Sequence, residues 1–291
     1  MRRTAAGLLA AALLTGCAQS VDPIERLGRK AAQGVRSQRP AAEQPYRRWG
    51  LAAPLPPPPR PPARPPGRPQ ARPLALPAGA ASSAGTASSA GTASPAAPPV
   101  VDHVDTTDKV VFLTYDDGAE QDPRFVDMVR ELRLPVSMFL TDGVAGPGYG
   151  HFARLLSVGA DLQNHTLDHP ALRGLPYAGQ RAEICGQRDK LHSRFGVRPR
   201  LFRPPYAAYD GTTLRAAADC GVAAVVLWRA STTEGGLHFT RGPRRLRPGD
   251  ILLVASDDDD LDGPTLHERT VRLLHRIQER GLTVGRLADY L

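Results

Sequence analysis

Residues 110–118 read Val-Val-Phe-Leu-Thr-Tyr-Asp-Asp-Gly, an apolar run that ends in two adjacent carboxylates and a glycine. The run predicts a buried β-strand at Val110–Leu113, and the polar residues after it predict a turn. Parallel α/β folds gather ligands and catalytic groups at the carboxyl ends of their strands. Two adjacent carboxylates at such an end repel each other. We therefore expect a bound cation or a raised pKa on one of them, unless this segment is only a solvated turn.

Six further apolar runs follow along the chain and alternate with segments of helical periodicity. The further strands are predicted at Val136–Leu140, Ala160–Gln163, Arg200–Phe202, Val222–Trp228, Ile251–Val254 and Leu282–Val284. The helices are predicted at Pro123–Leu132, Gly150–Val158, Tyr177–Phe195, Thr212–Cys220 and Leu266–Arg280. This alternation predicts a parallel sheet with helices outside it, either as a closed barrel or as an open doubly wound sheet. Periodicity alone does not choose between the two.

Two histidines, His165 and His169, follow the third predicted strand and lie four residues apart. On a helix, or on a loop that curls back, this spacing lets both imidazoles face one ion. Most histidine pairs at this spacing are ordinary surface residues. Here they lie at the same edge of the predicted sheet as Asp117, and two imidazoles with one carboxylate form a ligand set suited to a hydrolytic metal site.

The fourth predicted strand ends in Phe-Arg-Pro-Pro-Tyr, residues 202–206, at the same edge of the sheet. Because the two prolines restrict the backbone around them, the amide of Tyr206 can be held rigidly, as an oxyanion donor must be. Arg203 is placed to orient a nearby carboxylate. Taken alone, the segment also fits a proline-containing turn.

The three segments in this order, Asp-Asp-Gly, His-Thr-x-x-His and Arg-Pro-Pro-Tyr, resemble the polysaccharide deacetylase family. This family is also called the NodB-homology or carbohydrate esterase family 4 domains, and the likeness spans roughly residues 108–291. The resemblance implies a distorted (β/α)7 barrel, which agrees with the seven predicted strands. It implies that Asp117, His165 and His169 bind a divalent metal, for which Zn²⁺ is the natural ion although other divalent metals fit the same ligands.

The same resemblance implies roles for the residues around the metal. Asp116 would be the general base of amide hydrolysis, Arg203 would tether it, and the Tyr206 amide would stabilise the tetrahedral oxyanion. It also assigns Pro204, Tyr206 and Trp228 to the substrate groove. The implied activity is removal of N-acetyl groups from an amino-sugar polymer.

One part of the family pattern is absent from the sequence. Relatives supply a general acid from a histidine near the end of a late strand, where this chain has Ala255. They orient it with an aspartate after a tryptophan, where this chain has Ser231. His238 or one of Asp257–Asp260 are candidate substitutes, although the aspartate run is more typical of a solvated loop. Loss of a general acid reduces the rate by roughly 10²–10⁴-fold and need not abolish it.

The N-terminus has the pattern of an export signal. Residues 1–17 combine Arg2 and Arg3 with a short apolar run before Cys17, and Leu-Thr-Gly-Cys at residues 14–17 resembles the lipobox of bacterial lipoproteins. We therefore predict a chain lipidated at Cys17, anchored to the outer face of the membrane and reaching into the cell wall. An ordinary secretory signal is the alternative, and it too places the domain outside the cytoplasm.

Residues 18–100 are predicted to form a disordered, proline-rich and basic linker ahead of a domain at 101–291. Residues 1–100 hold 13 Lys and Arg against 3 acidic residues, whereas 101–291 hold 24 against 26. A nearly neutral domain argues against nucleic acid as a partner, while the basic tail favours anionic membrane or wall surfaces. Beyond Cys17, the chain has only Cys185 and Cys220, and the sequence leaves open whether they pair.

Three hypotheses for the function of the domain remain. The first is hydrolysis of N-acetyl groups on an extracellular polymer such as peptidoglycan or a chitin-like glycan. The second is a module that keeps the metal site and binds glycans without turning them over. The third is a metal-dependent hydrolase of another amide or ester.

Overall fold

The computed structural model of this chain describes residues 44–61, 96–118, 121–255 and 263–291. Together they belong to one unit that spans Gln44–Leu291. The predictions for Cys17 and for the Asp257–Asp260 run therefore lie outside the described residues. None of the helices in the described ranges has both the length and the apolar character that a membrane crossing needs.

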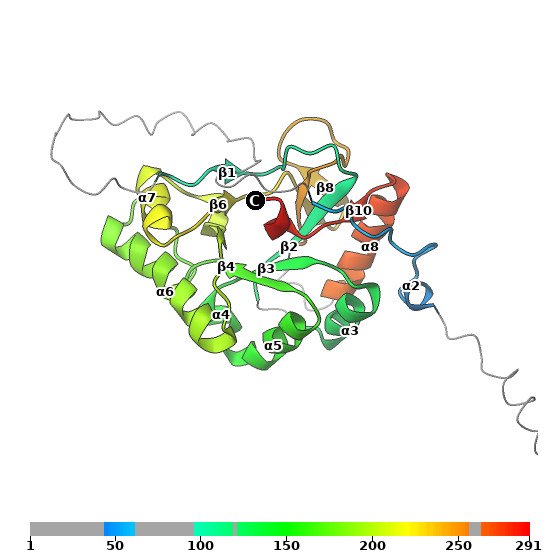
Figure 1. Cartoon of the computed structure of the whole chain (residues 1–291), viewed down its shortest axis with the longest axis horizontal. Helices are drawn as coiled ribbons and strands as arrows, with labels where there is room; N and C mark the ends of the chain where they lie inside the picture. Colours follow the sequence, from blue (N-terminus) through cyan, green and yellow to red (C-terminus); the bar gives the residue numbers. More distant parts are fainter. Residues whose placement is uncertain (1–43, 62–95, 119–120, 256–262) are drawn as a thin grey trace, which may run out of the picture. The chain divides into compact units, whose positions relative to one another are not determined.

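The strands form a single curled sheet with helices on its outside (Figure 1). Their order is β1-β6-β5-β4-β3-β2-β9-β7-β8, and β10 pairs with β2 off this path. All described neighbours run parallel except the β7–β8 hairpin. The strands are β1 Val100–Val101, β2 Val110–Asp117, β3 Val136–Leu140, β4 Asp161–Asn164, β5 Leu201–Phe202, β6 Ala224–Val226, β7 Ala230–Thr233, β8 Gly236–Phe239, β9 Ile251–Leu253 and β10 Thr283–Val284. The predicted distorted barrel is confirmed, as a curled sheet rather than an open doubly wound one.

The five predicted helices are present, with boundaries within about two residues of the predicted ones. The helices are α2 Pro45–Arg48, α3 Pro123–Leu132, α4 Asp142–Ala145, α5 Tyr149–Ser157, α6 Tyr177–Phe195, α7 Gly211–Asp219 and α8 Leu266–Glu279. Local sequence explains where two of them begin. Asp122 accepts a hydrogen bond from the Arg124 amide at 2.9 Å, and Thr265 forms a capping box with Glu268.

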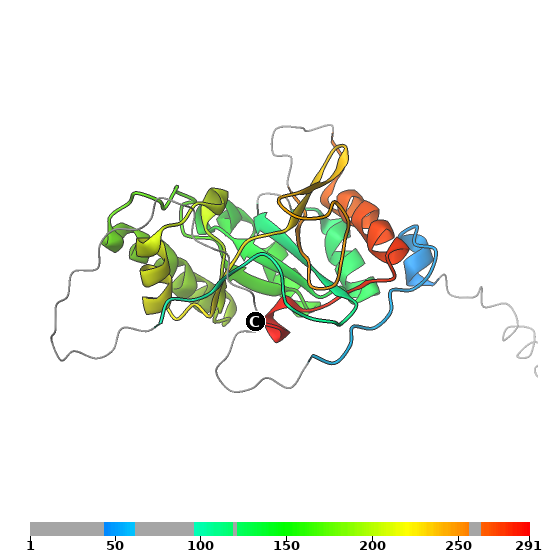
Figure 2. The same ribbon diagram turned by 90° about the horizontal axis from the view of Figure 1, so that it is seen from above.

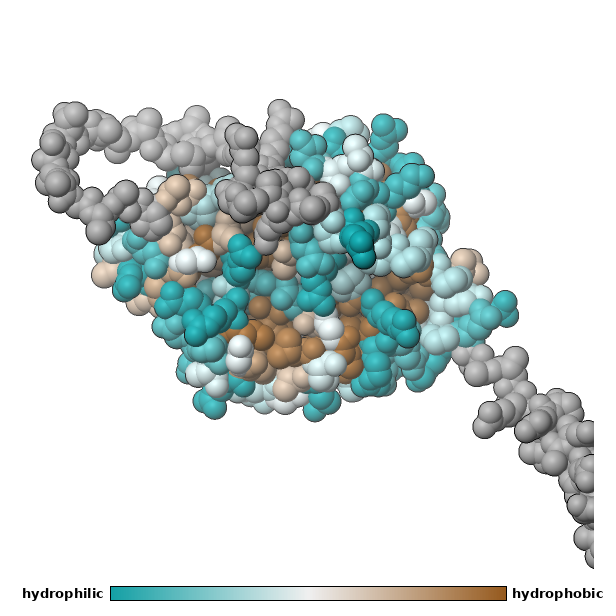
Figure 3. Space-filling model, in the orientation of Figure 1, coloured by the Kyte–Doolittle hydropathy of each residue, from teal (hydrophilic) through white to brown (hydrophobic). Residues whose placement is uncertain are grey.

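Two apolar layers hold the sheet in place. The helices outside cover one face through buried residues such as Phe125, Phe152 and Leu273. The other face encloses Phe112, and Tyr290 near the C-terminus packs edge-on against this ring at 5.1 Å between centroids. The C-terminal turn therefore closes the inside of the curl. On the face shown in Figure 3, apolar residues gather in one central area with hydrophilic residues around it.

The β7–β8 hairpin is not predicted by the sequence pattern. Its first strand, Ala-Ser-Thr-Thr, lacks the apolar run or clean alternation that predicts a strand, and Glu234-Gly235 forms the turn. Figure 2 shows the hairpin rising beside α8. It extends the sheet beyond β9, the strand that leads to Ala255.

Residues 44–61 differ from the predicted linker because they pack against the domain as a strap. Trp49 and Leu51 are only 4% and 2% exposed and join the outer core. The Trp49 indole donates to Glu131 at 2.8 Å, and Gln278 donates to the carbonyl of Ala53 at 2.7 Å. Two apolar anchors among prolines are thus enough to fix a segment whose composition is typical of a linker.

Cys185 on α6 and Cys220 at the end of α7 form a disulfide. The bond joins two helices that already pack against each other and cover β5 and β6. This answers the question that the cysteine count left open.

We predict that Trp49→Ala lowers the free energy of unfolding of the full chain by about 3 kcal/mol, because it removes a buried ring and its hydrogen bond. Denaturant unfolding checks this. Arg47→Ala is the control, because Arg47 is exposed on the same short helix and its loss should cost no more than about 0.5 kcal/mol. Equal stability of the two variants would show that the strap adds nothing to the fold.

Candidate active site

The predicted site residues meet at one edge of the sheet because their strands are neighbours. β2 runs directly into Asp116 and Asp117, β4 ends one residue before His165, and β5 ends one residue before Arg203. β2, β3, β4 and β5 are adjacent and parallel, so their carboxyl ends lie side by side. Strand order therefore brings together three segments that are far apart in the sequence.

Asp117, His165 and His169 converge on one point. The Oδ1 atom of Asp117 lies 3.2 Å from Nε2 of His169 and 3.5 Å from Nε2 of His165. One ligand atom from each residue lies within 4.8 Å of the other two. Two imidazole nitrogens and a carboxylate oxygen at this spacing fit one small divalent ion, and the donor set suits zinc. The histidines occupy a loop after β4 rather than a helix.

His165 is held in the tautomer that a metal ligand needs. Its Nδ1 lies 2.7 Å from the carbonyl oxygen of Arg203, which can only accept a hydrogen bond. Nδ1 therefore carries the proton, and the lone pair of Nε2 faces Asp117. Burial lowers the pKa of His165 below its ordinary value, which keeps the imidazole neutral and able to bind a metal.

The backbone around the site adopts strained conformations. Among the described residues, six non-glycine residues have positive φ, and five of these belong to the site: Asp117 (64°), Thr166 (75°), His169 (57°), Tyr206 (57°) and Ala207 (54°). Such conformations cost of order 1–3 kcal/mol each and persist only where the surroundings enforce them. Their concentration at one edge of the sheet supports a functional assignment for that edge.

Two residues that the sequence analysis did not single out enforce the histidine loop. Asn164 accepts a hydrogen bond from the Thr166 amide at 3.0 Å. Glu183 on α6 accepts from the amides of Leu167 and Asp168, both at 3.0 Å. Asn164 could have been found from the sequence, because it directly precedes His165. Glu183 could not have been found in this way, because its role depends on how α6 packs against the histidine loop.

Arg203 is completely buried, and its side chain connects β2, which carries Asp116, with the end of β6. It donates to Asp116 at 2.6 Å, to the Thr114 hydroxyl at 3.0 Å and to the carbonyl of Val226 at 3.1 Å. Its guanidinium also lies over the Phe139 ring, 4.3 Å from the centroid. Burial lowers the pKa of Arg203, the two carboxylates oppose that shift, and a guanidinium remains charged at physiological pH. The contact to Asp116 is the tether that the family pattern implies.

The three residues predicted to line a substrate groove differ in exposure. The Tyr206 side chain is exposed, and its ring meets His169 edge-on at 4.8 Å between centroids. Pro204 is buried and fixes the turn in which Tyr206 lies. Trp228 is half-buried, with the Arg203 guanidinium 5.3 Å from its ring. Of the three, Tyr206 is the most exposed.

The position of the expected general acid carries no titratable side chain. Thr114 of β2 pairs with Leu253, so Ala255, two residues on, lies level with Asp116. Ser231 of β7 also pairs with Leu253, which puts its side chain on the same face. His238 is the cross-strand partner of Ser231 and shares that face, but it is exposed and two strands from β9.

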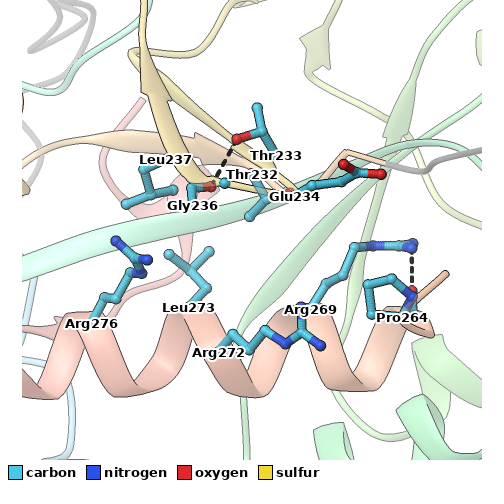
Figure 4. A pocket seen from close by; sticks show the side chains of 11 residues that line it. Thr232, Thr233, Glu234, Gly236, Leu237, Pro264, Arg269, Arg272, Leu273 and Arg276 are labelled. Atoms are coloured by element: carbon cyan, nitrogen blue, oxygen red, sulfur yellow. Dashed lines mark hydrogen bonds between the residues drawn. The ribbon is translucent and has the colours of Figure 1, made fainter.

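A separate cavity of about 110 Å³ lies between the β7–β8 hairpin and α8 (Figure 4). Arg269, Arg272 and Arg276 line it from the helix, and Glu234 lines it from the turn. The Thr232 hydroxyl at its wall accepts a hydrogen bond from the Ala255 amide at 2.9 Å. No proposed metal ligand lines this cavity, so it is distinct from the candidate metal site.

Comparison with known proteins identifies the family. The family model for polysaccharide deacetylase matches residues 103–225. An uncharacterised protein of Streptomyces coelicolor is 66% identical over 195 residues, covering 67% of this chain and 78% of that protein. The chain belongs to the polysaccharide deacetylase family. A chitooligosaccharide deacetylase of Sinorhizobium fredii is 25% identical, over 61% of this chain and 89% of that enzyme.

Solved structures show the same fold. A family 4 carbohydrate esterase pseudoenzyme from Bacillus anthracis aligns with a TM-score of 0.57 and 17% identity, covering 67% of this chain and 69% of that chain. A mutant of that pseudoenzyme, described as having restored enzymatic activity, aligns with the same TM-score. The fold therefore accommodates both active and inactive members.

We predict that His165→Ala weakens Zn²⁺ binding by at least about 100-fold, because it removes a preoriented nitrogen ligand. Competition with a chromophoric chelator measures the affinity. His192→Ala is the matched control, because His192 is exposed near the end of α6, away from the site, and its loss should leave binding unchanged. Equal affinities for the two variants would place the metal elsewhere.

Proposed function

We propose that the domain hydrolyses N-acetyl groups on an extracellular amino-sugar polymer. One observation supports this most strongly: the three convergent donors of Asp117, His165 and His169 lie next to Asp116, a carboxylate held by the buried Arg203. A metal site beside a positioned base is the minimum machinery for hydrolysis of an amide. Family membership favours an acetamide on a sugar as the group attacked.

Relatives indicate the class of polymer. By their names, related proteins act on chitooligosaccharides or on peptidoglycan N-acetylglucosamine. We propose a substrate of the same kind for this chain, a β-linked polymer of N-acetylated amino sugars. The exposed Tyr206 ring beside His169 offers a surface for a sugar ring next to the reacting acetamide.

The protein groups have distinct tasks in this reaction. Asp116 accepts the proton of the attacking water, and Arg203 keeps that carboxylate pointed at the site. The Tyr206 amide, in a turn fixed by two prolines, is the proposed donor to the developing oxyanion. A divalent ion held by Asp117, His165 and His169, most naturally Zn²⁺, would lower the pKa of water and polarise the acetamide carbonyl.

A second candidate function is glycan binding without turnover. It is favoured by Ala255 and Ser231, which leave the leaving amine without the usual proton donor. The fold similarity to a pseudoenzyme makes this alternative concrete. Because a general acid contributes roughly 10²–10⁴-fold, we favour a slow hydrolase over an inert module.

We also propose that the protein acts outside the cytoplasm, anchored to the membrane through a lipid on Cys17. The leader-like residues 1–17 support this. The Cys185–Cys220 disulfide supports it independently, because such bonds persist mainly in oxidising compartments. Labelling of the chain with a radioactive fatty acid, lost in Cys17→Ser, tests the anchor.

The hydrolase proposal predicts acetate release from N-acetylglucosamine oligomers or peptidoglycan fragments by the zinc-loaded full chain. Asp116→Asn should reduce this release to background, because the amide cannot accept the proton from water. Asp168→Asn is a control with the same chemical change on a residue that follows β4 but is not a proposed ligand. No release above Asp116→Asn from a folded, zinc-loaded chain would favour the glycan-binding module.

Restoring the missing acid provides a second prediction. The double variant Ala255→His/Ser231→Asp should raise the rate of acetate release by about 100-fold, because it places an oriented imidazole level with Asp116. Ala255→Gln/Ser231→Asn is the control, similar in size but unable to donate a proton at neutral pH. An unchanged rate would mean that the chain already has a proton donor. If His238→Ala then abolished the residual activity, His238 would be that donor.

A further inference from the structure

A second group of charged residues lies in the loop between β8 and β9. Residues 241–247 read Arg-Gly-Pro-Arg-Arg-Leu-Arg, four arginines in seven positions. Residues 241–245 are exposed, whereas Leu246 is only 7% exposed and packs into the outer core. The loop is thus anchored by its one apolar side chain and presents its arginines to solvent.

A buried arginine fixes the conformation of this loop. Arg229 is completely buried, and its guanidinium donates to three loop carbonyls: Arg241 at 2.9 Å, Pro243 at 3.2 Å and Arg245 at 2.6 Å. The same guanidinium pairs with the buried Asp250, with one contact at 3.0 Å. Burying an ion pair is costly unless every polar atom is satisfied, and here the loop carbonyls satisfy the arginine. Internal charge is therefore used to hold a surface loop rigid.

The end of the loop is equally constrained. Gly249 has a φ of +84°, and a Cβ at this position would lie 1.9 Å from the carbonyl oxygen of Val104. Its carbonyl accepts from the Val104 amide at 2.8 Å, and its amide donates to Val110 at 2.8 Å. Only glycine fits here. The loop consequently has little conformational entropy to lose when it binds a ligand.

Two of the four arginines of the loop are not neutralised by the described acidic residues around them. Arg241 pairs with Asp102, and Arg247 lies 3.6 Å from Asp250, which Arg229 already binds. Within the described ranges, Arg244 and Arg245 have no ion pair through their side chains. Two guanidinium groups on a rigid support are therefore available to an external anion.

The loop lies at the opposite edge of the sheet from the candidate metal site. It leads into the start of β9, and Gly249 bonds to Val110 at the start of β2, whereas Asp117 is at the end of β2. Seven strand steps separate Val110 from Asp117, about 23 Å at 3.3 Å per residue. An anionic surface bound at the loop would leave the metal site free and turned away from that surface.

We propose that the Arg241–Arg247 loop is a docking surface for a membrane rich in anionic phospholipid. Arginine binds phosphate oxygens through paired N–H groups, and a rigid pair of guanidiniums suits a plane of headgroups. The N-terminal 100 residues also carry an excess of positive charge, which would favour the same anionic surface as the loop arginines. This inference rests on the proposed membrane anchor, since only 26 residues, at most about 90 Å of chain, separate Cys17 from Gln44. It does not rest on the proposed catalysis.

Vesicle co-sedimentation of the full, non-lipidated chain tests the proposal, with phosphatidylcholine vesicles that contain or lack phosphatidylglycerol. Arg244→Gln/Arg245→Gln should reduce partitioning onto the anionic vesicles about 30-fold, or about fivefold per arginine. Added salt should shrink the difference. Arg272→Gln/Arg276→Gln is the matched control, because it removes the same charge from two exposed arginines of α8. The control should bind like the unchanged chain.

Three outcomes would overturn the proposal. The loop variant could bind as well as the unchanged chain, which would assign all binding to the basic tail. Both double variants could lose vesicle binding to the same extent, which would show that binding depends only on net charge. Finally, soluble polyphosphate could bind in a loop-dependent way while vesicles do not, which would assign the loop to a phosphate-bearing polymer. Acetate release should be the same in all variants, so failure here is distinguishable from failure of the proposed hydrolysis.

Discussion

The candidate site depends on the buried guanidinium of Arg203. Its side chain binds Asp116, while its own carbonyl oxygen binds Nδ1 of His165. One residue therefore orients the proposed base and sets the tautomer of a proposed ligand. Its charge offsets two neighbouring carboxylates that would otherwise repel each other at the end of β2. Removing Arg203 would leave the partly buried Asp116 beside Asp117 without compensation, which is why Arg203 and Asp116 have to be considered as one unit.

A second buried arginine, Arg229, supports the opposite edge of the sheet. Arg229 is as fully buried as Arg203, pairs with Asp250 and binds loop carbonyls. Each arginine lies at one end of the parallel strands, where loops need support that strand pairing cannot give. At the edge of the candidate metal site, Arg203 holds Asp116 through its side chain and His165 through its carbonyl oxygen. At the opposite edge it maintains a row of exposed cations.

Sequence predicted most of what depends on local pattern. The apolar run into Asp116, the histidine pair and the Arg-Pro-Pro-Tyr segment gave the site, because each follows a strand and parallel strands end at one edge. The strap at residues 44–61 was not predicted, because its prolines conceal the two apolar anchors Trp49 and Leu51. The β7–β8 hairpin was missed because both strands are short and β7 is polar. The role of Glu183 and the Cys185–Cys220 bond depend on how α6 packs, which no local pattern encodes.

The absence of an acid at position 255 separates two steps of hydrolysis, the attack by water and the protonation of the leaving amine. The residues proposed to bind a metal and to activate water lie together, whereas a group that could protonate the leaving amine is not among the described residues level with Asp116. Without the acid, water activated at the proposed metal site would still attack an acetamide, slowly. A site that only holds a glycan is the alternative.

The most direct test of this account is an anomalous-scattering map, recorded at the zinc edge, from crystals of the protein grown with Zn²⁺. We predict one strong peak within about 2.0–2.2 Å of Nε2 of His165, Nε2 of His169 and a carboxylate oxygen of Asp117. A peak elsewhere, or no peak at these residues in a zinc-saturated crystal, would contradict it.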